Sequence, residues 1–436
     1  MANKKHFIRP LAGVLTCVLI ASLLISAVAI PRQYGSFKEY WWEKHGGKVQ
    51  YPCVLVHGLG GFGESNTQDV VSYWGATTGN LPKYLREQGY TVCVPTVGPY
   101  SSTWDKTCEL YAQLTGTRVD YGEAHAKQHG HARYGRTYTQ AMVPNWGSKI
   151  NGGQIVKIDL VGHSFGGTTV RMLASLLAYG DETEKAASGS SVSPLFSGGK
   201  ADYIQSVTTI CAPHNGSQLT CIVDDLGGIA GIKDTTSLLV GTLFRLVKAV
   251  DAKAGTPDMM LEQFGIGKNA DVETSVQQLE SVGTDHAFYD LTPDGAAKLN
   301  QTIRTVDSVY YFSYAFSTTK DGTLLRGKVP ETSTFPALYP LALAMGSYTG
   351  TTKGGILIDE TWQDNDGLVS VVSAQYPSGE THADMLDDAS ALTPGVWSVA
   401  PTERGDHGYA VGLNADTTKT QQFFITILNL AASLPR

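Results

Sequence analysis

Residues Ile155-Val-Lys-Ile-Asp-Leu-Val161 run directly into Gly162-His-Ser-Phe-Gly-Gly167, and this stretch decides how the chain folds. The first run has the character of a buried strand, and the residues after it read as a helix that reaches about residue 178. Gly-x-Ser-x-Gly between a strand and a helix is typical of a nucleophile elbow, a tight turn whose glycines leave room for strained serine backbone angles. The pattern alone is weak in a chain with 48 glycines, so its context between strand and helix decides the interpretation. Ser164 is therefore the candidate nucleophile.

Short β-branched runs alternate with helical stretches along the rest of the chain, which is the pattern of a parallel sheet flanked by helices. Together with the elbow, this alternation predicts an α/β-hydrolase fold, with a mostly parallel central sheet, for residues 30–436 as one domain. The further expected elements are strands at 51–56, 90–97, 203–210 and 308–316 and helices at 81–88 and 423–434.

A serine nucleophile needs a histidine as base and a carboxylate that orients the histidine, and in this fold they follow in the order Ser, Asp, His. His407 lies in a loop before the last expected helix, and its competitor is His382, which lies in a polar run without strand context. Asp366 stands in a turn before an apolar run and is the chosen acid, with Asp364 as the alternative. A turn aspartate often satisfies its own backbone, so this alternative stays open.

The oxyanion hole of such an enzyme combines two backbone N–H groups, one from the residue after the nucleophile and one from the loop after the first core strand. Phe165 follows the nucleophile. The loop is His57-Gly-Leu-Gly-Gly61, in which Leu59 is the expected donor.

The N-terminus differs in composition from the rest of the chain. Basic residues precede an uncharged run at 11–30, and Ala27-Val-Ala29 fits the small-x-small rule for signal peptidase. We therefore expect residues 1–29 to be a cleaved export signal and the protein to be secreted. The alternative is an uncleaved membrane anchor, because about twenty apolar residues can span a bilayer.

Composition excludes some classes of partner. The net charge is −7 and no basic cluster stands out, so nucleic acid is not an expected partner, and no obligate protein partner is evident. Five of the six cysteines lie outside the predicted signal at irregular spacing, which indicates mostly buried free thiols instead of a disulfide scaffold. Cys211 and Cys221 are close enough in sequence to pair, but we expect both to be free.

Three longer stretches interrupt the alternation, and long segments in a compact domain are usually functional. Residues 98–150 are rich in aromatic residues and histidine, 182–200 read as a polar loop, and about 214–285 are mostly helical, where a lid or cap is inserted. Within the last stretch an apolar stripe recurs at helical spacing, which predicts a lid helix or, equally by periodicity, a helix packed permanently on the core. The stripe consists of Leu239, Leu243, Leu246, Val247 and Val250.

The chain resembles the thermoalkalophilic bacterial lipases, the zinc-containing group that includes staphylococcal lipases. The likeness is densest in Ser102-Thr-Trp-Asp105 and in Val119-Asp-Tyr-Gly-Glu-Ala-His125-Ala-Lys-Gln-His-Gly-His131, a long and unusual motif. It continues through the elbow, Pro213-His214 and Asn365-Asp-Gly367, and it covers nearly all of the mature chain. The resemblance supports Ser164, Asp366 and His407 as the triad.

The same resemblance implies a structural zinc site (Zn²⁺) formed by Asp105, His125, His131 and Asp285. Two imidazoles and two carboxylates suit tetrahedral zinc, and four protein ligands leave no open position for catalysis. The related lipases also bind calcium (Ca²⁺) beside the catalytic histidine, using acidic residues after it. Here those places hold Tyr409 and Asn414, followed by Ala415, so calcium is doubtful at this place.

The leading expectation is a triacylglycerol lipase or carboxylesterase that acts on a lipid or ester substrate at an interface, with polyesters as further substrates that the resemblance implies. The alternative is a short-chain carboxylesterase or polyester hydrolase with little true lipase activity. Two other classes are less well supported. A metallohydrolase would need an open position on the metal, and a non-catalytic lipid-binding protein would not need an intact serine, aspartate and histidine set.

Overall fold

A computed structural model of the chain describes residues 51–64, 72–149, 153–230, 258–267, 279, 283–322 and 327–435, without the side chains of 226–230. The predicted export signal at 1–29 and the predicted lid helix at 239–250 lie outside the described residues. Among the described helices, none is both long and apolar enough to cross a membrane.

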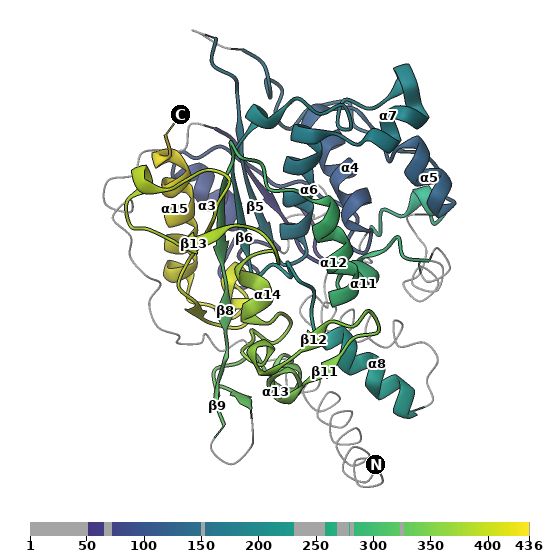
Figure 1. The fold of residues 1–436 in the computed structure, drawn as a ribbon. Coiled ribbons are helices and arrows are strands. Elements are labelled where there is room, and N and C mark those ends of the chain that lie inside the picture. The colour runs from purple at the N-terminus through teal and green to yellow at the C-terminus, as the bar shows by residue number, and fades with distance from the viewer. Residues whose placement is uncertain are drawn as a thin grey trace.

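A seven-stranded sheet, parallel throughout, forms the centre of the structure (Figure 1). Because all strands point the same way, their carboxyl ends meet at one edge, where α/β proteins place their sites. In sheet order the strands are β13 (His382–Asp384), β14 (Trp397–Val399), β7 (Tyr310–Tyr314), β6 (Ile204–Ile210), β5 (Ile158–His163), β1 (Cys53–Val56) and β2 (Val92–Cys93).

Helices cover both faces of the sheet, as Figure 1 shows. Successive residues of β1 point to opposite faces: Cys53 and Leu55 pack into the apolar cluster under α3 and α15, whereas Val54 and Val56 pack into the cluster under α4 and α6. Both faces are therefore buried, as expected of a parallel sheet. The helices are α3 (Leu81–Glu87) and α15 (Thr417–Ser433) on one face, with α4 (Thr103–Thr115), α6 (Gly166–Tyr179) and α12 (Pro293–Thr302) on the other.

The described residues of the stretch 98–150, which end at 149, form a small subdomain beside α6. It contains α4, the antiparallel pair β3 (Arg118–Asp120) and β4 (Tyr134–Thr137), and between them α5 (Glu123–His129). The short helix α7 (Glu182–Ser188) lies beside α5 in Figure 1, so a segment far away in sequence supports this subdomain. In the stretch 214–285, the described part contains α8 (Leu219–Ala230), which begins soon after β6.

Several local expectations need correction. The strand expected at 90–97 is only two residues long, because the chain turns away from β1 after Cys93. The polar loop expected at 182–200 contains α7, whose first turn is capped by the side chain of Asp181. His382 does have strand context, because it begins β13, an edge strand whose three residues are all exposed.

The cysteine prediction is confirmed. Cys53, Cys108 and Cys211 are buried free thiols, and Cys93 and Cys221 are half-buried free thiols. No disulfide therefore contributes to the described part of the fold.

Candidate active site and metal centre

Ser164 occupies the tight turn between β5 and α6 that the sequence predicts. Its φ of +55° is a left-handed conformation that costs a non-glycine residue about 1 to 3 kcal/mol, and its N–H donates to the Ile210 carbonyl over 2.8 Å. Glycine is required on both sides, because a Cβ at Gly162 would lie 2.5 Å from the Gly166 carbonyl oxygen. A Cβ at Gly166 would lie 2.3 Å from the Val56 carbonyl oxygen. The turn thus presents the serine at the carboxyl edge of the sheet.

His407 and Asp366 form a buried pair. Nδ1 of His407 lies 2.7 Å from Oδ2 of Asp366, and the His407 N–H donates to the Asp366 carbonyl over 2.9 Å. Oδ1 of Asp366 accepts the backbone N–H groups of Leu368 and Val369, at 2.9 and 2.8 Å. Both oxygens of the Asp366 carboxylate are therefore hydrogen-bonded. Nε2 of the imidazole takes no part in this pair, so it is available to act as a general base.

The two rival residues from the sequence lie elsewhere. Oδ1 of Asp364 accepts the hydroxyls of Ser317 and Thr319, the second over 2.7 Å. His382 stacks on Tyr376 at the far edge of the sheet, four strands from β5. Neither residue contacts His407 in the described part of the chain, whereas Asp366 does.

The loop after β1 is fixed next to the serine. Val97 N–H donates to Nε2 of His57 over 3.1 Å, so the His57 proton lies on Nδ1 and is donated to the Gly58 carbonyl over 2.9 Å. Burial lowers the pKa of His57 to about 3, so the ring stays neutral. A Cβ at Gly58 would lie 2.6 Å from the Ser164 Cβ, which shows how closely the loop approaches the serine.

The position of the Gly58 carbonyl also fixes the next amide. In a trans peptide the N–H of Leu59 points away from the Gly58 carbonyl, and therefore away from His57. Within the described residues, the N–H groups of Leu59 and Phe165 donate to no protein acceptor. These are the two amides that the sequence predicts for an oxyanion hole.

A cavity opens beside Ser164. His407 and Leu59 line it together with the serine, and most of the remaining wall is apolar. Apolar side chains from several separate segments contribute, among them Leu219, Leu291, Phe335, Leu338, Val411 and Leu413.

A second group of polar residues converges in the 98–150 subdomain. Nε2 of His125 lies 3.3 Å from Oδ1 of Asp105 and 3.4 Å from Oδ2 of Asp285, and Nε2 of His131 lies 3.2 Å from the same Asp285 oxygen. All four atoms are buried and have no hydrogen-bond partner among the described residues. Bonds of about 2.0 to 2.1 Å to one tetrahedral ion place its ligand atoms about 3.3 Å apart, so the group fits a small divalent cation.

The local structure explains the convergence of the two histidines. His125 lies in α5, and Gly130, with φ +74°, ends that helix and turns the chain so that His131 faces the same point. Nδ1 of His131 lies 2.9 Å from the Ala132 carbonyl, which leaves Nε2 available to a cation.

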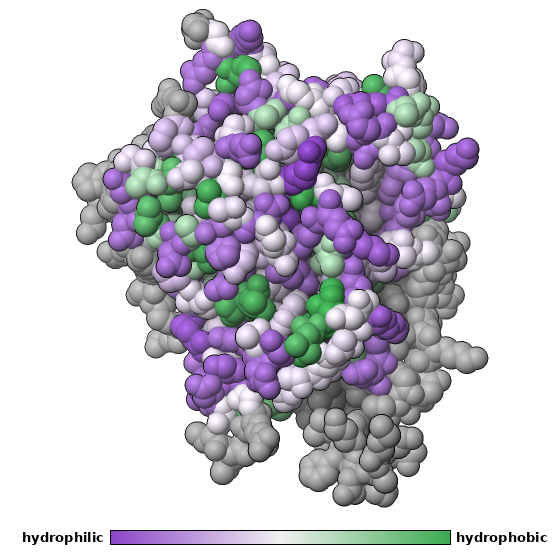
Figure 2. All heavy atoms as spheres, in the orientation of Figure 1, coloured by the Kyte–Doolittle hydropathy of each residue, from purple (hydrophilic) through white to green (hydrophobic). Residues whose placement is uncertain are grey.

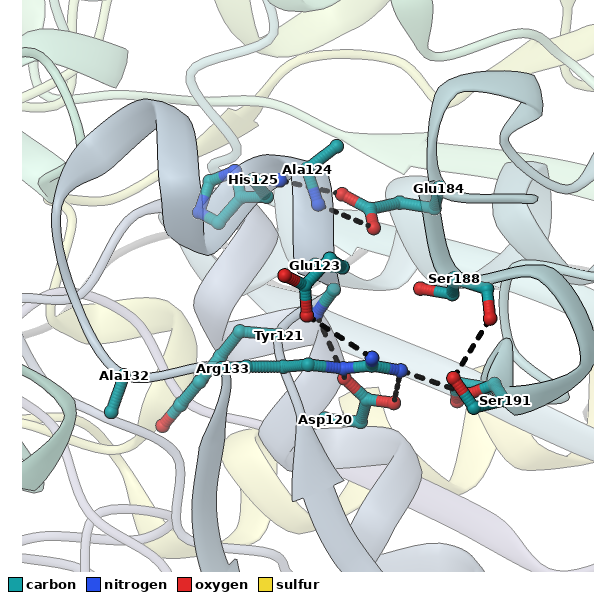
Figure 3. A network of polar contacts seen from close by, with 12 residues as sticks. Asp120, Tyr121, Glu123, Ala124, His125, Ala132, Arg133, Glu184, Ser188 and Ser191 are labelled. Carbon is teal, nitrogen blue, oxygen red and sulfur yellow. Dashed lines mark hydrogen bonds and ion pairs between the residues drawn. The ribbon is translucent and has the colours of Figure 1, made fainter. Parts of the chain in front are cut away.

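Sequence reasoning missed the residues that support this group. In Figure 3 the carboxylate of Glu184, from α7, faces the start of α5, where it accepts the N–H groups of Ala124 and His125 at 3.0 and 2.7 Å. Arg133 donates to both oxygens of Asp120, each over 2.9 Å, and so closes the β3–β4 hairpin.

Comparison with known proteins assigns the family. Residues 49–430 match the family model of the lipase-like, C-terminal domain. The chain belongs to this lipase family. Lipase 2 of Staphylococcus aureus is 34% identical over 377 residues, which are 84% of this chain and 51% of that protein. The chain thus spans about half the length of the curated relatives it matches.

Two solved structures resemble this lipase-like chain over nearly its whole length. EstA from Clostridium botulinum is 32% identical with a TM-score of 0.78, covering 95% of this chain and 98% of that one. Staphylococcus hyicus lipase is 30% identical with a TM-score of 0.71, covering 88% and 95% of the two chains. The predicted α/β-hydrolase fold and the predicted likeness to staphylococcal lipases are therefore confirmed.

The place where related lipases were expected to bind calcium lacks the acidic side chains at Tyr409 and Asn414. Instead, the Asn414 N–H donates to the Thr77 hydroxyl over 2.6 Å, and the Thr77 N–H donates to the Gly412 carbonyl over 3.0 Å. Hydrogen bonds to the segment at 75–78 thus hold the loop after His407.

Proposed function

We propose that this lipase-like chain hydrolyses carboxylic esters of lipids through an acyl-enzyme on Ser164. The observation that carries the proposal is the buried His407–Asp366 pair, whose histidine lines an apolar cavity together with Ser164 of the strained elbow. The named lipases and esterases among its relatives and structural neighbours support the same reaction class.

The proposed reaction has two halves. Nε2 of His407 takes the proton of Ser164 Oγ as that oxygen attacks the ester carbonyl, and Asp366 stabilises the imidazolium that forms. The N–H groups of Leu59 and Phe165 stabilise the oxyanion, and the histidine proton then passes to the leaving alcohol. In the second half, His407 deprotonates a water that attacks the acyl group, and the carboxylic acid and free Ser164 are released.

The distribution of apolar surface favours a substrate with an acyl chain. The face of the molecule in Figure 2 is mostly hydrophilic, with small apolar patches, whereas the cavity beside Ser164 is mostly apolar. An acyl chain is therefore stabilised inside the cavity, where it leaves water. A short-chain carboxylesterase or polyester hydrolase uses the same chemistry and remains the alternative.

Chain-length profiling distinguishes these substrates. Turnover should be measured on p-nitrophenyl esters of increasing acyl length and on emulsified triglyceride with the same enzyme preparation. We expect activity on medium or long chains and on the emulsion, because each added CH₂ that leaves water stabilises binding by about 0.8 kcal/mol. Activity confined to the shortest esters would support the alternative, and no turnover of any ester would contradict the proposal.

We further propose that Asp105, His125, His131 and Asp285 hold one zinc ion with a structural role. Two imidazole nitrogens and two carboxylate oxygens are a donor set that zinc accepts, and all four positions would be filled by protein. None of the four residues is among those that line the described cavity, which supports a role in stability and not in ester cleavage.

Removing the metal should lower the melting temperature more than the rate of ester hydrolysis. We expect His125→Ala to lose the bound zinc and to melt about 5 °C or more below the parent protein, because an ion that binds only the folded state stabilises it. The matched control is His129→Ala, in the same helix. The His129 ring lies 4.5 Å from that of His125 between centroids, tilted by 39°, but His129 is outside the ligand group. Equal zinc content in both variants by metal analysis, or a stable but inactive His125→Ala protein, would contradict this role.

The secreted location also remains a proposal, supported by the basic start and uncharged run of residues 1–29. N-terminal sequencing of protein recovered outside the cell would locate the cleavage site.

A further inference from the structure

Tyr73 connects two parts of the candidate active site that are far apart in sequence. Its hydroxyl accepts the Gly58 N–H over 3.0 Å and lies 2.5 Å from Nδ1 of His163, the residue directly before the nucleophile. Nε2 of His163 in turn lies 3.1 Å from the backbone carbonyl of His407. One chain of hydrogen bonds thus joins the loop after β1, the elbow and the loop that carries the catalytic histidine.

The direction of every proton in this chain is determined. The Gly58 N–H can only donate, so the Tyr73 oxygen accepts from it, and the one hydroxyl proton is left for Nδ1 of His163. His163 therefore carries its proton on Nε2, where the carbonyl of His407 can only accept. Burial, and then the nearby His407 charge, hold the pKa of His163 well below its usual range, so the ring stays neutral and this tautomer is kept.

Tyr73 is itself held by packing. The next residue, Trp74, is fully buried, with its ring edge-on to His163 at 6.2 Å and to Phe424 of α15 at 5.7 Å. The Gly75 N–H donates to the Val411 carbonyl over 2.7 Å. These contacts hold the backbone beside Tyr73, and this fixes the position of its hydroxyl.

We propose that Tyr73 and His163 are positioning residues that lock the oxyanion loop and the His407 loop to the nucleophile elbow. This inference rests on the proposed function, since it concerns how that same site is kept ready for ester attack. His57 fixes the Gly58 carbonyl and Tyr73 fixes the Gly58 N–H, so both ends of this residue are held and the Leu59 N–H keeps its direction. Preorganised donors of this kind stabilise the transition state because they need no rearrangement during the reaction.

Tyr73→Phe tests the proposal, because it keeps the ring and removes only the hydroxyl. We expect kcat for a p-nitrophenyl ester to fall by about 10- to 100-fold, less than for loss of a whole oxyanion donor, with KM changed by no more than about threefold. The matched control is Tyr90→Phe, which also removes a buried tyrosine hydroxyl bond (2.8 Å, to Asn429) but lies away from the cavity. The melting temperature of Tyr90→Phe should fall by about as much as that of Tyr73→Phe, and its kcat should not change.

Equal kcat values for Tyr73→Phe and Tyr90→Phe, in a parent enzyme that hydrolyses esters, would overturn the positioning role alone. A parent enzyme without any esterase activity would instead overturn the proposed function. His163→Asn provides the second arm. If the chain acts as one unit, the double variant with Tyr73→Phe should be no slower than the slower single variant, whereas independent effects would multiply.

The protonation state of His163 can also be measured without kinetics. In ¹⁵N-histidine-labelled protein, the nitrogen chemical shifts of His163 should show its proton on Nε2 and no titration between pH 5 and 9. The His163 signal is the one that disappears in His163→Asn, which separates it from other buried histidines such as His214. A His163 ring that is protonated on Nδ1, or that titrates in this range, would overturn the proposed chain of donors.

Discussion

Ser164→Ala should lower kcat for ester hydrolysis by about 10⁴-fold or more, because the elbow presents no second nucleophile to the cavity. Alanine occupies the same left-handed backbone conformation as serine, at φ +55°, so the fold should be retained. The assay is turnover of a p-nitrophenyl ester, with the melting temperature measured beside it.

Ser175→Ala is the matched control for this variant. Ser175 lies further along α6, where its hydroxyl accepts the Arg304 N–H over 3.0 Å, and it does not line the cavity. We expect full activity from the control. Substantial turnover by Ser164→Ala would rule out the serine mechanism.

Asp366→Asn should be the second most damaging change, with a loss of about 10⁴-fold in kcat at neutral pH. An asparagine amide turned toward His407 donates a proton to Nδ1 where the carboxylate accepts one, so the imidazole keeps the wrong tautomer for a base. The backbone N–H groups of Leu368 and Val369 can still donate to the amide oxygen of the asparagine, so the turn should persist.

Asp364→Asn distinguishes the two candidate acids under the same assay. The Asp364 carboxylate accepts hydrogen bonds from the hydroxyls of Ser317 and Thr319 and not from His407 in the described part of the chain. This variant should therefore lose some stability and little activity. If Asp364→Asn is the crippled variant and Asp366→Asn is active, the acid assignment is wrong.

The elbow was predictable because its cause is local. A buried strand, two crowded glycine positions and a helix start are all contained in residues 158–179, so the sequence pattern carries the geometry. The choice between Asp366 and Asp364 was not local. Both lie in the same turn, and only the return of the chain at residue 407 shows which carboxylate faces the histidine.

The missed elements have physical reasons as well. All three residues of β13 are exposed, so this edge strand has no alternation of apolar and polar side chains to recognise. Helix α7 did carry a signal: Asp181 caps the N–H of Glu184, an Asp-x-x-Glu start that resembles a capping box. Small residues after it concealed the helix.

The metal group was predictable only from a resemblance. His125 and His131 are close in sequence, but Asp285 follows a long intervening segment, and no spacing rule joins it to them. Likewise, Gln263 donates to the second oxygen of Asp105 over 2.9 Å. Gln263 is far from Asp105 in sequence, and no sequence pattern connects the two.

Labelling by an organophosphonate tests the central claim most directly, because the reagent reacts only with a serine that is activated by its base and faced by an oxyanion hole. Intact-mass spectrometry should show one adduct per chain, peptide mapping should place it on Ser164, and esterase activity should fall in proportion to labelling. An enzyme that stays unlabelled while it hydrolyses esters, or an adduct on another residue, would contradict the account.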